Sequence, residues 1–289
     1  MNLNNYNNRV TVIAVSYYSE GIIENFIKSI DNNIKILIVE NSLNLNLKKN
    51  IEKKYKNVEV VIPNRNLGNG GGINCGLKRV ETEYALYLDV DTVPEKNMIN
   101  ELLKHSNIIQ DFSILAPKDL SHHYSKDLYI NFNESENIHK MQFITGCAMF
   151  IKMKELKKIG FFDENIFLYY EEHDFYFRCH KANLGIYLID NAIFTHVGSS
   201  AIDKKYDYQI SINRNWHFCW SKFYYYKKNY NYLYGLKKTF PNFFRAIKKY
   251  LFFMIKRENK NAALHKAEIN GLLASYMLKK SYYRPNIKA

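Results

Sequence analysis

The stretch YALYLDVD, residues 84–91, decides the fold expected of this chain, because an apolar run here ends in two carboxylates separated by one residue. Such a run is typical of a buried strand, and open α/β sheets bind ligands at the carboxyl ends of their strands. At that edge, Asp89 and Asp91 could hold a divalent cation beside a phosphate. An Asp-x-Asp pair followed by Pro94 is also good turn chemistry, so a plain strand-to-turn junction stays open.

Apolar runs and helical spacing alternate on both sides of this stretch. Before it, strands are predicted at 10–16, 34–39 and 58–62, and helices at 22–30 and 47–55. This alternation predicts a doubly wound, mainly parallel α/β sheet. The elements expected downstream are a helix at 99–109, a strand at 114–117, a mobile loop or irregular hairpin at 121–140, a strand at 143–151, a helix at 154–159 and a strand at 185–189.

Glycines are concentrated just before residue 84. Four of the twelve fall within residues 68–72, so the backbone there must turn sharply or approach another part of the chain closely. A Rossmann fingerprint would follow the first strand, whereas these glycines follow the third. A P-loop would have Lys at the position of Leu77. Neither motif is therefore present. A strand-to-helix turn that binds no ligand is the alternative.

A second group of acids lies in residues 161–174, FFDENIFLYYEEHD, where carboxylates alternate with aromatic rings. We expect part of this segment to face a pocket, where a carboxylate beside apolar rings can act as a general base. The alternative is the acidic first turn of an amphipathic helix, in which Asp174 and Arg178 could pair. Further on, an apolar run ends at His196, which is either structural or able to complete a metal site begun by carboxylates.

Composition restricts the class of protein. The 289 residues are 47% hydrophobic and 15% aromatic, with 5 prolines, which excludes a disordered chain. Four widely spaced cysteines predict reduced thiols in a cytosolic protein rather than a disulfide framework or a zinc site. The N-terminus is polar, so we expect no signal peptide, and no long apolar run is present, so we expect no membrane span.

Positive charge is concentrated in the last third of the chain. Residues 204–289 contain 19 Lys and Arg but 3 Asp and Glu, whereas the rest of the chain contains 22 and 25. Within this part, residues 241–257 have apolar and cationic side chains on different faces of a predicted helix. Such a helix is typical of contact with an anionic membrane surface, and docking on the rest of the protein is the alternative.

Taken together, these segments resemble a family 2 glycosyltransferase of the GT-A fold, closest to the rhamnosyltransferase-like branch that builds bacterial surface polysaccharides. The resemblance rests on the order and spacing of SYY at 16–18, VENS at 39–42, NRNLG at 64–68, DVD at 89–91 and the acidic segment 161–178, followed by His196. It implies a Rossmann-like, mainly parallel central sheet flanked by helices. The GT-A catalytic domain would be 1–203, and 204–289 a basic, largely α-helical extension.

The resemblance also implies roles for single residues. Glu40 matches the acid that reads the nucleobase or ribose of the donor, Asp89 would face the ribose, and Asp91 with His196 would hold the metal. Glu172 falls where the family places its catalytic base, and its near neighbours Glu171 and Asp174 leave this assignment open. Family members usually carry Asp at the positions of both Glu40 and Glu172. The other positions assigned to the nucleotide-sugar site are Ser16, Arg65, Gly68 and Gly146, of which Gly146 lies toward the acceptor.

The function implied is inverting transfer of a sugar from a nucleotide-diphosphate sugar to a glycan or polyprenyl-linked acceptor, with Mg²⁺ or Mn²⁺ as cofactor. The enzyme would be cytoplasmic, with peripheral membrane contact through residues 241–257. A nucleic-acid-binding protein would explain the basic tail but not the acidic segment, so no nucleic acid partner is expected. A GT-A-like nucleotidyltransferase would carry a Gly-rich loop with Lys where residues 16–21 read SYYSEG.

Overall fold

The computed structural model describes residues 7–130, 137–197 and 206–284, which form two compact units. The larger unit takes in the described residues of 1–67, 71–162 and 175–203. The smaller unit takes in those of 68–70, 163–174 and 204–289. The expected domains, 1–203 and 204–289, stay a prediction.

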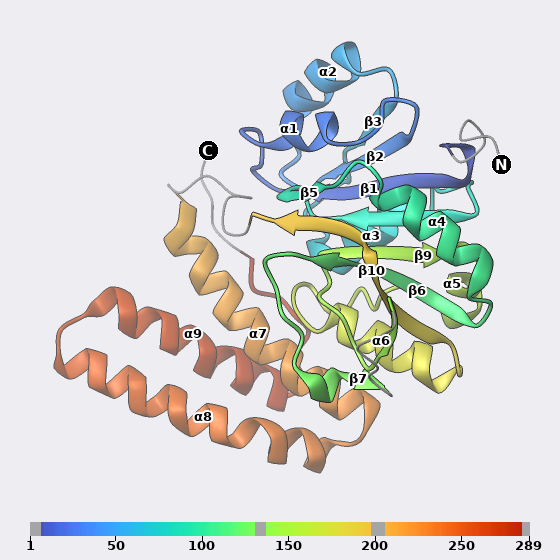
Figure 1. The fold of residues 1–289 in the computed structure, drawn as a ribbon. Helices are drawn as coiled ribbons and strands as arrows, with labels where there is room; N and C mark the ends of the chain where they lie inside the picture. The colour runs from blue at the N-terminus through green and yellow to red at the C-terminus, as the bar shows by residue number, and fades with distance from the viewer. Residues whose placement is uncertain (1–6, 131–136, 198–205, 285–289) are drawn as a thin grey trace. The chain divides into compact units, whose positions relative to one another are not determined.

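The larger unit is built on one mixed sheet (Figure 1). Its strands among the described residues are β1 Val10–Ser16, β2 Lys35–Glu40, β3 Val58–Val61, β4 Tyr84–Leu88, β5 Thr92–Pro94, β6 Phe112–Asp119, β7 Tyr129–Ile130, β8 Ile138–Met141, β9 Ala148–Lys152 and β10 Gly185–His196. They run in the order β3-β2-β1-β4-β9-β6-β10-β8-β7, and β5 pairs with β10. Strands β1 to β4 are parallel, and β9 lies antiparallel between β4 and β6. The predicted α/β architecture with a mainly parallel core is confirmed.

Helices cover both faces of this sheet, and the buried strands divide their side chains between the two faces. On β1, Val10, Val12 and Ala14 belong to one hydrophobic cluster, and Ile13 belongs to the other. This alternation follows from the two-residue period of a strand. The helices of the first cluster are α1 Ile23–Lys28, α2 Leu45–Lys54 and α4 Met98–Ile108. Those of the second are α3 Gly68–Leu77 from Gly71 on, α5 Met153–Ile159 and α6 Glu171–Lys181 from Phe175 on.

The glycine-rich segment, for which the sequence predicted a sharp turn or a close approach, begins a helix. The glycines lie in α3, where two of them allow a close approach to β1. A Cβ at Gly76 would lie 2.5 Å from Cγ2 of Ile13, and one at Gly72 would lie 2.9 Å from the side chain of Val15. The predicted close approach is therefore confirmed, because the helix packs so closely against side chains of the strand that a further side chain would not fit.

One further segment begins later than predicted, and another, expected to be a mobile loop or an irregular hairpin, contains two paired strands. The strand expected at 143–151 begins only at Ala148, because the N–H of Thr145 donates to the Tyr124 hydroxyl at 3.0 Å. In the segment 121–140, β7 and β8 pair antiparallel, and residues 131–136 lie outside the described part of the chain.

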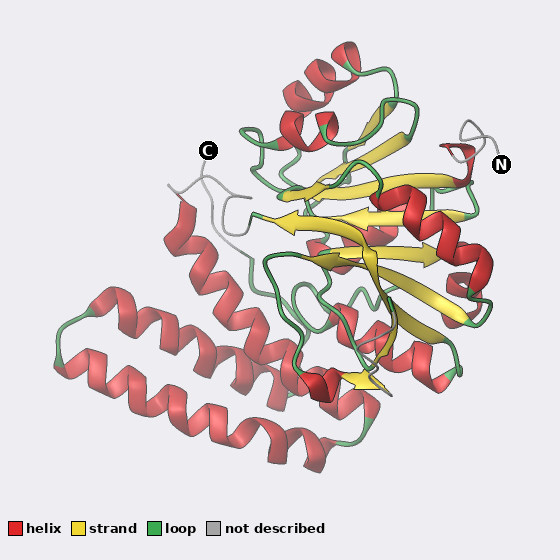
Figure 2. Ribbon diagram, viewed as in Figure 1, coloured by secondary structure: helices red, strands yellow, loops and turns green. Residues whose placement is uncertain are grey.

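The C-terminal part of the smaller unit consists of long helices (Figure 2). These are α7 Asp207–Asn229, α8 Tyr232–Ile255 and α9 Asn259–Tyr276, and each packs against the other two. Trp216 and Trp220 of α7 pack with Ala267 and Ala274 of α9. Gly271 is required there, because a Cβ would lie 2.2 Å from the carbonyl oxygen of Trp216. The predicted helical extension is confirmed, and none of its described helices is long and apolar enough to cross a bilayer.

Candidate active site

The predicted acidic pair lies at the carboxyl edge of the sheet, where a long-range strand pairing brings His196 to it. After β4 ends at Leu88, the N–H of Asp89 donates to the Cys147 carbonyl at 2.8 Å, and the hydroxyl of Thr92 donates to the Asp89 carbonyl at 2.7 Å. This turn leads into β5, which pairs antiparallel with the end of β10 and places Thr92 opposite His196. Nε2 of His196 consequently lies 3.1 Å from Oδ1 of Asp91.

Asp89, Asp91 and His196 form a donor set that fits a divalent cation. One ligand atom of each lies within 4.8 Å of the others. Two carboxylates and an imidazole suit Mn²⁺, and the carboxylates suit Mg²⁺. The hydrogen bond to Asp91 raises the pKa of His196, against the lowering effect of burial. Asp91 has a side chain only 7% exposed, so a cation bound there would balance its buried charge.

Sequence reasoning missed two neighbours of His196. Asp119 and Cys147 also form a possible ligand group with it. Asp119 accepts hydrogen bonds from the N–H and the hydroxyl of Ser121, at 2.9 and 2.7 Å, and from the N–H of His196 at 3.3 Å. Burial raises the pKa of Cys147 to about 12, so without a metal its thiol stays protonated at neutral pH. The set with Asp89 and Asp91 is therefore the better cation site. Asp119 could have been found in the sequence as an acid that follows the predicted strand at 114–117 and so lies at the end of β6.

The residues predicted to bind the nucleoside lie at the same edge. Ser16 and Glu40 end β1 and β2 and are opposite each other in the strand register. Glu40 is fully buried, and its Oε1 accepts hydrogen bonds from the N–H of Ser42 at 2.8 Å and from the Ser42 hydroxyl. Burial raises the pKa of Glu40, and the Ser16 and Ser42 hydroxyls act in the opposite direction. Gly146 comes just before β9, whose first residue pairs with Leu88.

Arg65 and Gly68 are placed differently from these residues. Arg65 is exposed. Gly68 begins α3 with φ +77° and belongs to the smaller unit. A Cβ there would lie 2.1 Å from the carbonyl oxygen of Phe167, so only glycine fits this approach. Gly68 therefore has a structural reason to be glycine, and its proposed contact with the donor stays a prediction.

The acidic segment belongs to the smaller unit, and its three candidate bases have different surroundings. Glu171 is 3% exposed and accepts a hydrogen bond from Asn69 at 2.8 Å. Asp174 is fully buried, and its Oδ1 lies 2.7 Å from Nζ of Lys228. Glu172 has a side chain 21% exposed, with Oε1 3.3 Å from Nδ1 of His173. Glu172 is thus the acid of the three that a substrate can reach most readily.

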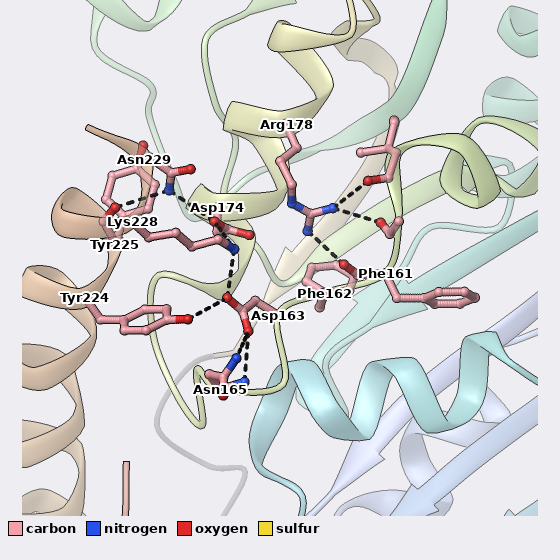
Figure 3. Close-up of polar contacts among 12 residues, drawn as sticks. Phe161, Phe162, Asp163, Asn165, Asp174, Arg178, Tyr224, Tyr225, Lys228 and Asn229 are labelled. Atoms are coloured by element: carbon pink, nitrogen blue, oxygen red, sulfur yellow. Dashed lines mark hydrogen bonds and ion pairs between the residues drawn. The ribbon is translucent and has the colours of Figure 1, made fainter. Parts of the chain in front are cut away.

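The interaction suggested between Asp174 and Arg178 stays a prediction, and Arg178 also contacts the main chain. Arg178 donates to the main-chain carbonyls of Ile159, Gly160 and Phe161, at 3.0, 2.9 and 2.8 Å (Figure 3). This guanidinium therefore joins α6 to the end of α5 within the larger unit.

A mixed sheet of this order, with two acids and a histidine at its carboxyl edge, defines a GT-A-like nucleotide-binding fold. Residues 11–160, more than half of the 289, match the model of the family described as Glycosyl transferase family 2. The chain therefore belongs to glycosyl transferase family 2.

Similar proteins agree with this placement. The low-salt glycan biosynthesis hexosyltransferase Agl10 of Haloferax volcanii is 25% identical over 203 residues, which cover 61% of this chain and 63% of Agl10. The chain thus spans less than two thirds of the length of that relative.

Two solved structures have the same fold. One is the mannosyltransferase PcManGT from Pyrobaculum calidifontis in complex with GDP-Man and Mn²⁺, with a TM-score of 0.61, 14% identity, and coverage of 96% of this chain and 89% of that one. The other is S. aureus TarS 1-349 in complex with UDP-GlcNAc, with a TM-score of 0.54, 14% identity, and coverage of 96% and 93%. At these identities the likeness concerns the fold alone.

Proposed function

We propose that this chain is an inverting, metal-dependent hexosyltransferase that moves a sugar from a nucleotide-diphosphate sugar to a hydroxyl of a glycan or lipid-linked acceptor. The observation that carries the proposal is the meeting of Asp89, Asp91 and His196 at the carboxyl edge of a family 2 sheet. The hexosyltransferase named for glycan biosynthesis among its relatives supports a hexose donor and a glycan acceptor. A rhamnosyltransferase-like role in bacterial surface polysaccharide synthesis rests on the sequence resemblance.

The donor would lie along the carboxyl ends of β1, β2 and β4. Ser16 and Glu40 would contact its nucleoside and Asp89 its ribose, with Arg65 and Gly68 beside the nucleotide. Asp91 and His196 would hold Mg²⁺ or Mn²⁺, which when bound supplies positive charge for the leaving diphosphate. The PcManGT complex contains GDP-Man with Mn²⁺, which supports this combination of ligands.

Glu172 would act as the general base on the acceptor side, to which Gly146 is also assigned. It would take the proton of the acceptor hydroxyl while that oxygen bonds to the anomeric carbon and the bond to the diphosphate breaks. One displacement of this kind inverts the anomeric configuration. No covalent sugar intermediate forms, so a second nucleophilic carboxylate is not required.

We also propose that α8 contacts an anionic membrane surface, which would bring a cytoplasmic enzyme to a polyprenyl-linked acceptor. The end of α8 exposes large apolar side chains, with exposed fractions of 53% for Leu251, 46% for Met254 and 84% for Ile255. The same part of the chain has exposed cationic residues at Arg245, Lys248, Lys249, Lys256 and Arg257. Apolar residues beside Lys and Arg favour a lipid interface.

The membrane contact is tested by pelleting the full chain with vesicles of phosphatidylglycerol. Replacing both Leu251 and Ile255 by Ser should reduce the bound fraction, and raising the salt concentration should reduce it further. Replacing Leu45, which is 68% exposed in α2, by Ser is the control. Pelleting that is unchanged in the double variant would contradict the membrane contact.

The proposed activity is tested with a panel of GDP-, UDP- and dTDP-sugars. The full chain, with Mn²⁺ or Mg²⁺ and mixed glycan acceptors, should release a nucleoside diphosphate from at least one donor, and EDTA should stop this release. Full turnover in EDTA would contradict the metal dependence. If no donor with either metal gives turnover or thermal stabilisation, the hexosyltransferase assignment is wrong.

The nucleic-acid-binding alternative is not favoured, because the family match covers β1 to β9, the glycine-rich helix and the acidic pair rather than the basic tail. The nucleotidyltransferase alternative is disfavoured for the same reason.

A further inference from the structure

A single lysine of α7 holds both ends of the segment that contains Glu172. Nζ of Lys228 lies 2.7 Å from Oδ2 of Asp163 and 2.7 Å from Oδ1 of Asp174 (Figure 3). These two acids are the first and last residues of the stretch Asp163–Asp174, which belongs with α7 to the smaller unit. One ammonium group therefore joins the two ends of this stretch, which we call the loop 163–174. Glu172 lies two residues before its end, in the first turn of α6.

Other side chains of α7 hold the loop at its start, middle and end. The hydroxyl of Tyr224 donates to Oδ2 of Asp163 at 3.1 Å, and that of Ser221 donates to the carbonyl of Leu168 at 2.8 Å. Asn229 donates to Oδ1 of Asp174 at 3.1 Å. Residues 221, 224 and 228 have the spacing of one helix face. The loop is thus built against α7 along its whole length.

The carboxylates of this arrangement are buried and depend on their partners. The side chain of Asp174 is 0% exposed and that of Asp163 is 11% exposed, whereas Lys228 is 31% exposed. Buried carboxylates need a cation and hydrogen bonds to stay ionised. The other oxygen of Asp163 accepts hydrogen bonds from the main chain and side chain of Asn165, at 3.0 and 2.8 Å. Removal of Lys228 would leave both carboxylates without their ammonium partner.

The backbone just before the candidate base is strained. Tyr169 and Tyr170 have φ angles of 64° and 68°, in the left-handed region that is costly for residues with a side chain. Such conformations persist only where the surroundings hold them. The Tyr170 ring packs against Tyr225 and Phe218 of α7, with centroids 5.5 and 5.7 Å away. The same helix therefore holds this strained turn and the two ends of the loop.

We propose that Lys228 is a positioning residue for Glu172, which fixes the loop 163–174 in the shape that presents the base to the acceptor. This inference rests on the proposed function. It makes α7 part of the catalytic machinery, although the sequence of 204–289 indicates only a basic extension. Lys228 acts through Asp163 and Asp174 and does not need to touch either substrate.

The test compares Lys228→Met, Lys228→Arg and the control Lys227→Met, which removes the neighbouring charge of α7. In Lys228→Met we expect kcat to fall about 10- to 100-fold, the usual effect of a small misplacement of a catalytic group. The KM for the donor should not change. Lys228→Arg keeps a cation at this place and should recover part of kcat, and Lys227→Met should match the wild type.

Hydrogen exchange measured by mass spectrometry gives a readout without activity. Amides of residues 163–174 should exchange faster in Lys228→Met than in the wild type, and those of β1 to β4 should not. If Lys228→Met does not fold, the double variant with Asp174→Asn, which removes the buried charge together with its partner, takes its place. Wild-type kcat in the folded variant, or a fall equal to that of Lys227→Met, would overturn the inference.

Failure of the proposed function gives a different result. In that case the wild-type chain would turn over no nucleotide-sugar, while hydrogen exchange would still show whether Lys228 holds the loop. Unchanged exchange in residues 163–174 would contradict the positioning role on its own.

Discussion

Replacing Glu172 with glutamine should remove proton acceptance and keep the shape of the side chain. Glu172 has a side chain 21% exposed and its contact with His173 is 3.3 Å long. The change should therefore cost less than about 1 kcal/mol of folding free energy. A positioned general base contributes roughly 10²- to 10⁴-fold to the rate, or about 3–5 kcal/mol of activation free energy. We expect kcat to fall by that factor with donor affinity unchanged.

The assay for this variant is single-turnover transfer to the acceptor, with donor affinity measured by calorimetry. Glu171→Gln is the matched control, because Glu171 is 3% exposed and its carboxylate is engaged by Asn69. It should keep transfer in the folded protein. Asp174→Asn should instead lower the free energy of unfolding by about 3 kcal/mol, because it breaks a buried ion pair. Transfer at the wild-type rate in Glu172→Gln would refute the reasoning, and loss of transfer in Glu171→Gln alone would move the base.

Two predictions concern the fold. Gly76→Val should lower the free energy of unfolding by about 2–3 kcal/mol through overpacking, because a Cβ would lie 2.5 Å from Ile13. Gly21→Val, with nothing within 4 Å of its Cβ, is the control in urea titrations, and equal losses in the two variants would contradict the packing of α3. Burial alone would raise the pKa of Asp163, but Lys228 and Asn165 bring it below 3.8. Its contribution to stability is therefore present above that pH and lost as the pH falls through the lower folded pKa. Both tryptophans of the chain, Trp216 and Trp220, lie in the smaller unit, so their fluorescence in an acid titration reports this loss, and in Lys228→Met the loss should begin at higher pH.

The buried strands were predictable because their pattern has one cause. β1, β2 and β4 are covered on both faces, so nearly every residue is apolar, and their carboxyl ends meet in a parallel sheet. Ser16, Glu40, Asp89 and Asp91 could thus be placed at one edge from the sequence alone. The contact of His196 with Asp91 depends on the pairing of β5 with β10, between segments about a hundred residues apart, which no local pattern encodes.

Other features were missed for identifiable reasons. Glycine has the lowest helix propensity after proline, so the glycines of residues 68–72 did not indicate a helix, but the approach of α3 to Ile13 requires a residue without a side chain. Asp119 and Cys147 carried no motif. Lys228 was one of many cations in a basic tail, and only the folded chain shows that it joins Asp163 to Asp174.

The central claim is that Asp91 and His196 hold a divalent cation, and binding of Mn²⁺ measured by electron paramagnetic resonance tests it most directly. The titration is made with a nucleoside diphosphate present, on the wild type, Asp91→Asn and Cys147→Ser. We expect Asp91→Asn to weaken Mn²⁺ binding by at least about tenfold, because loss of even an outer-shell partner of a ligand costs about that much. Cys147→Ser should bind Mn²⁺ as the wild type does. Unchanged binding in Asp91→Asn, or binding lost only in Cys147→Ser, would contradict the account.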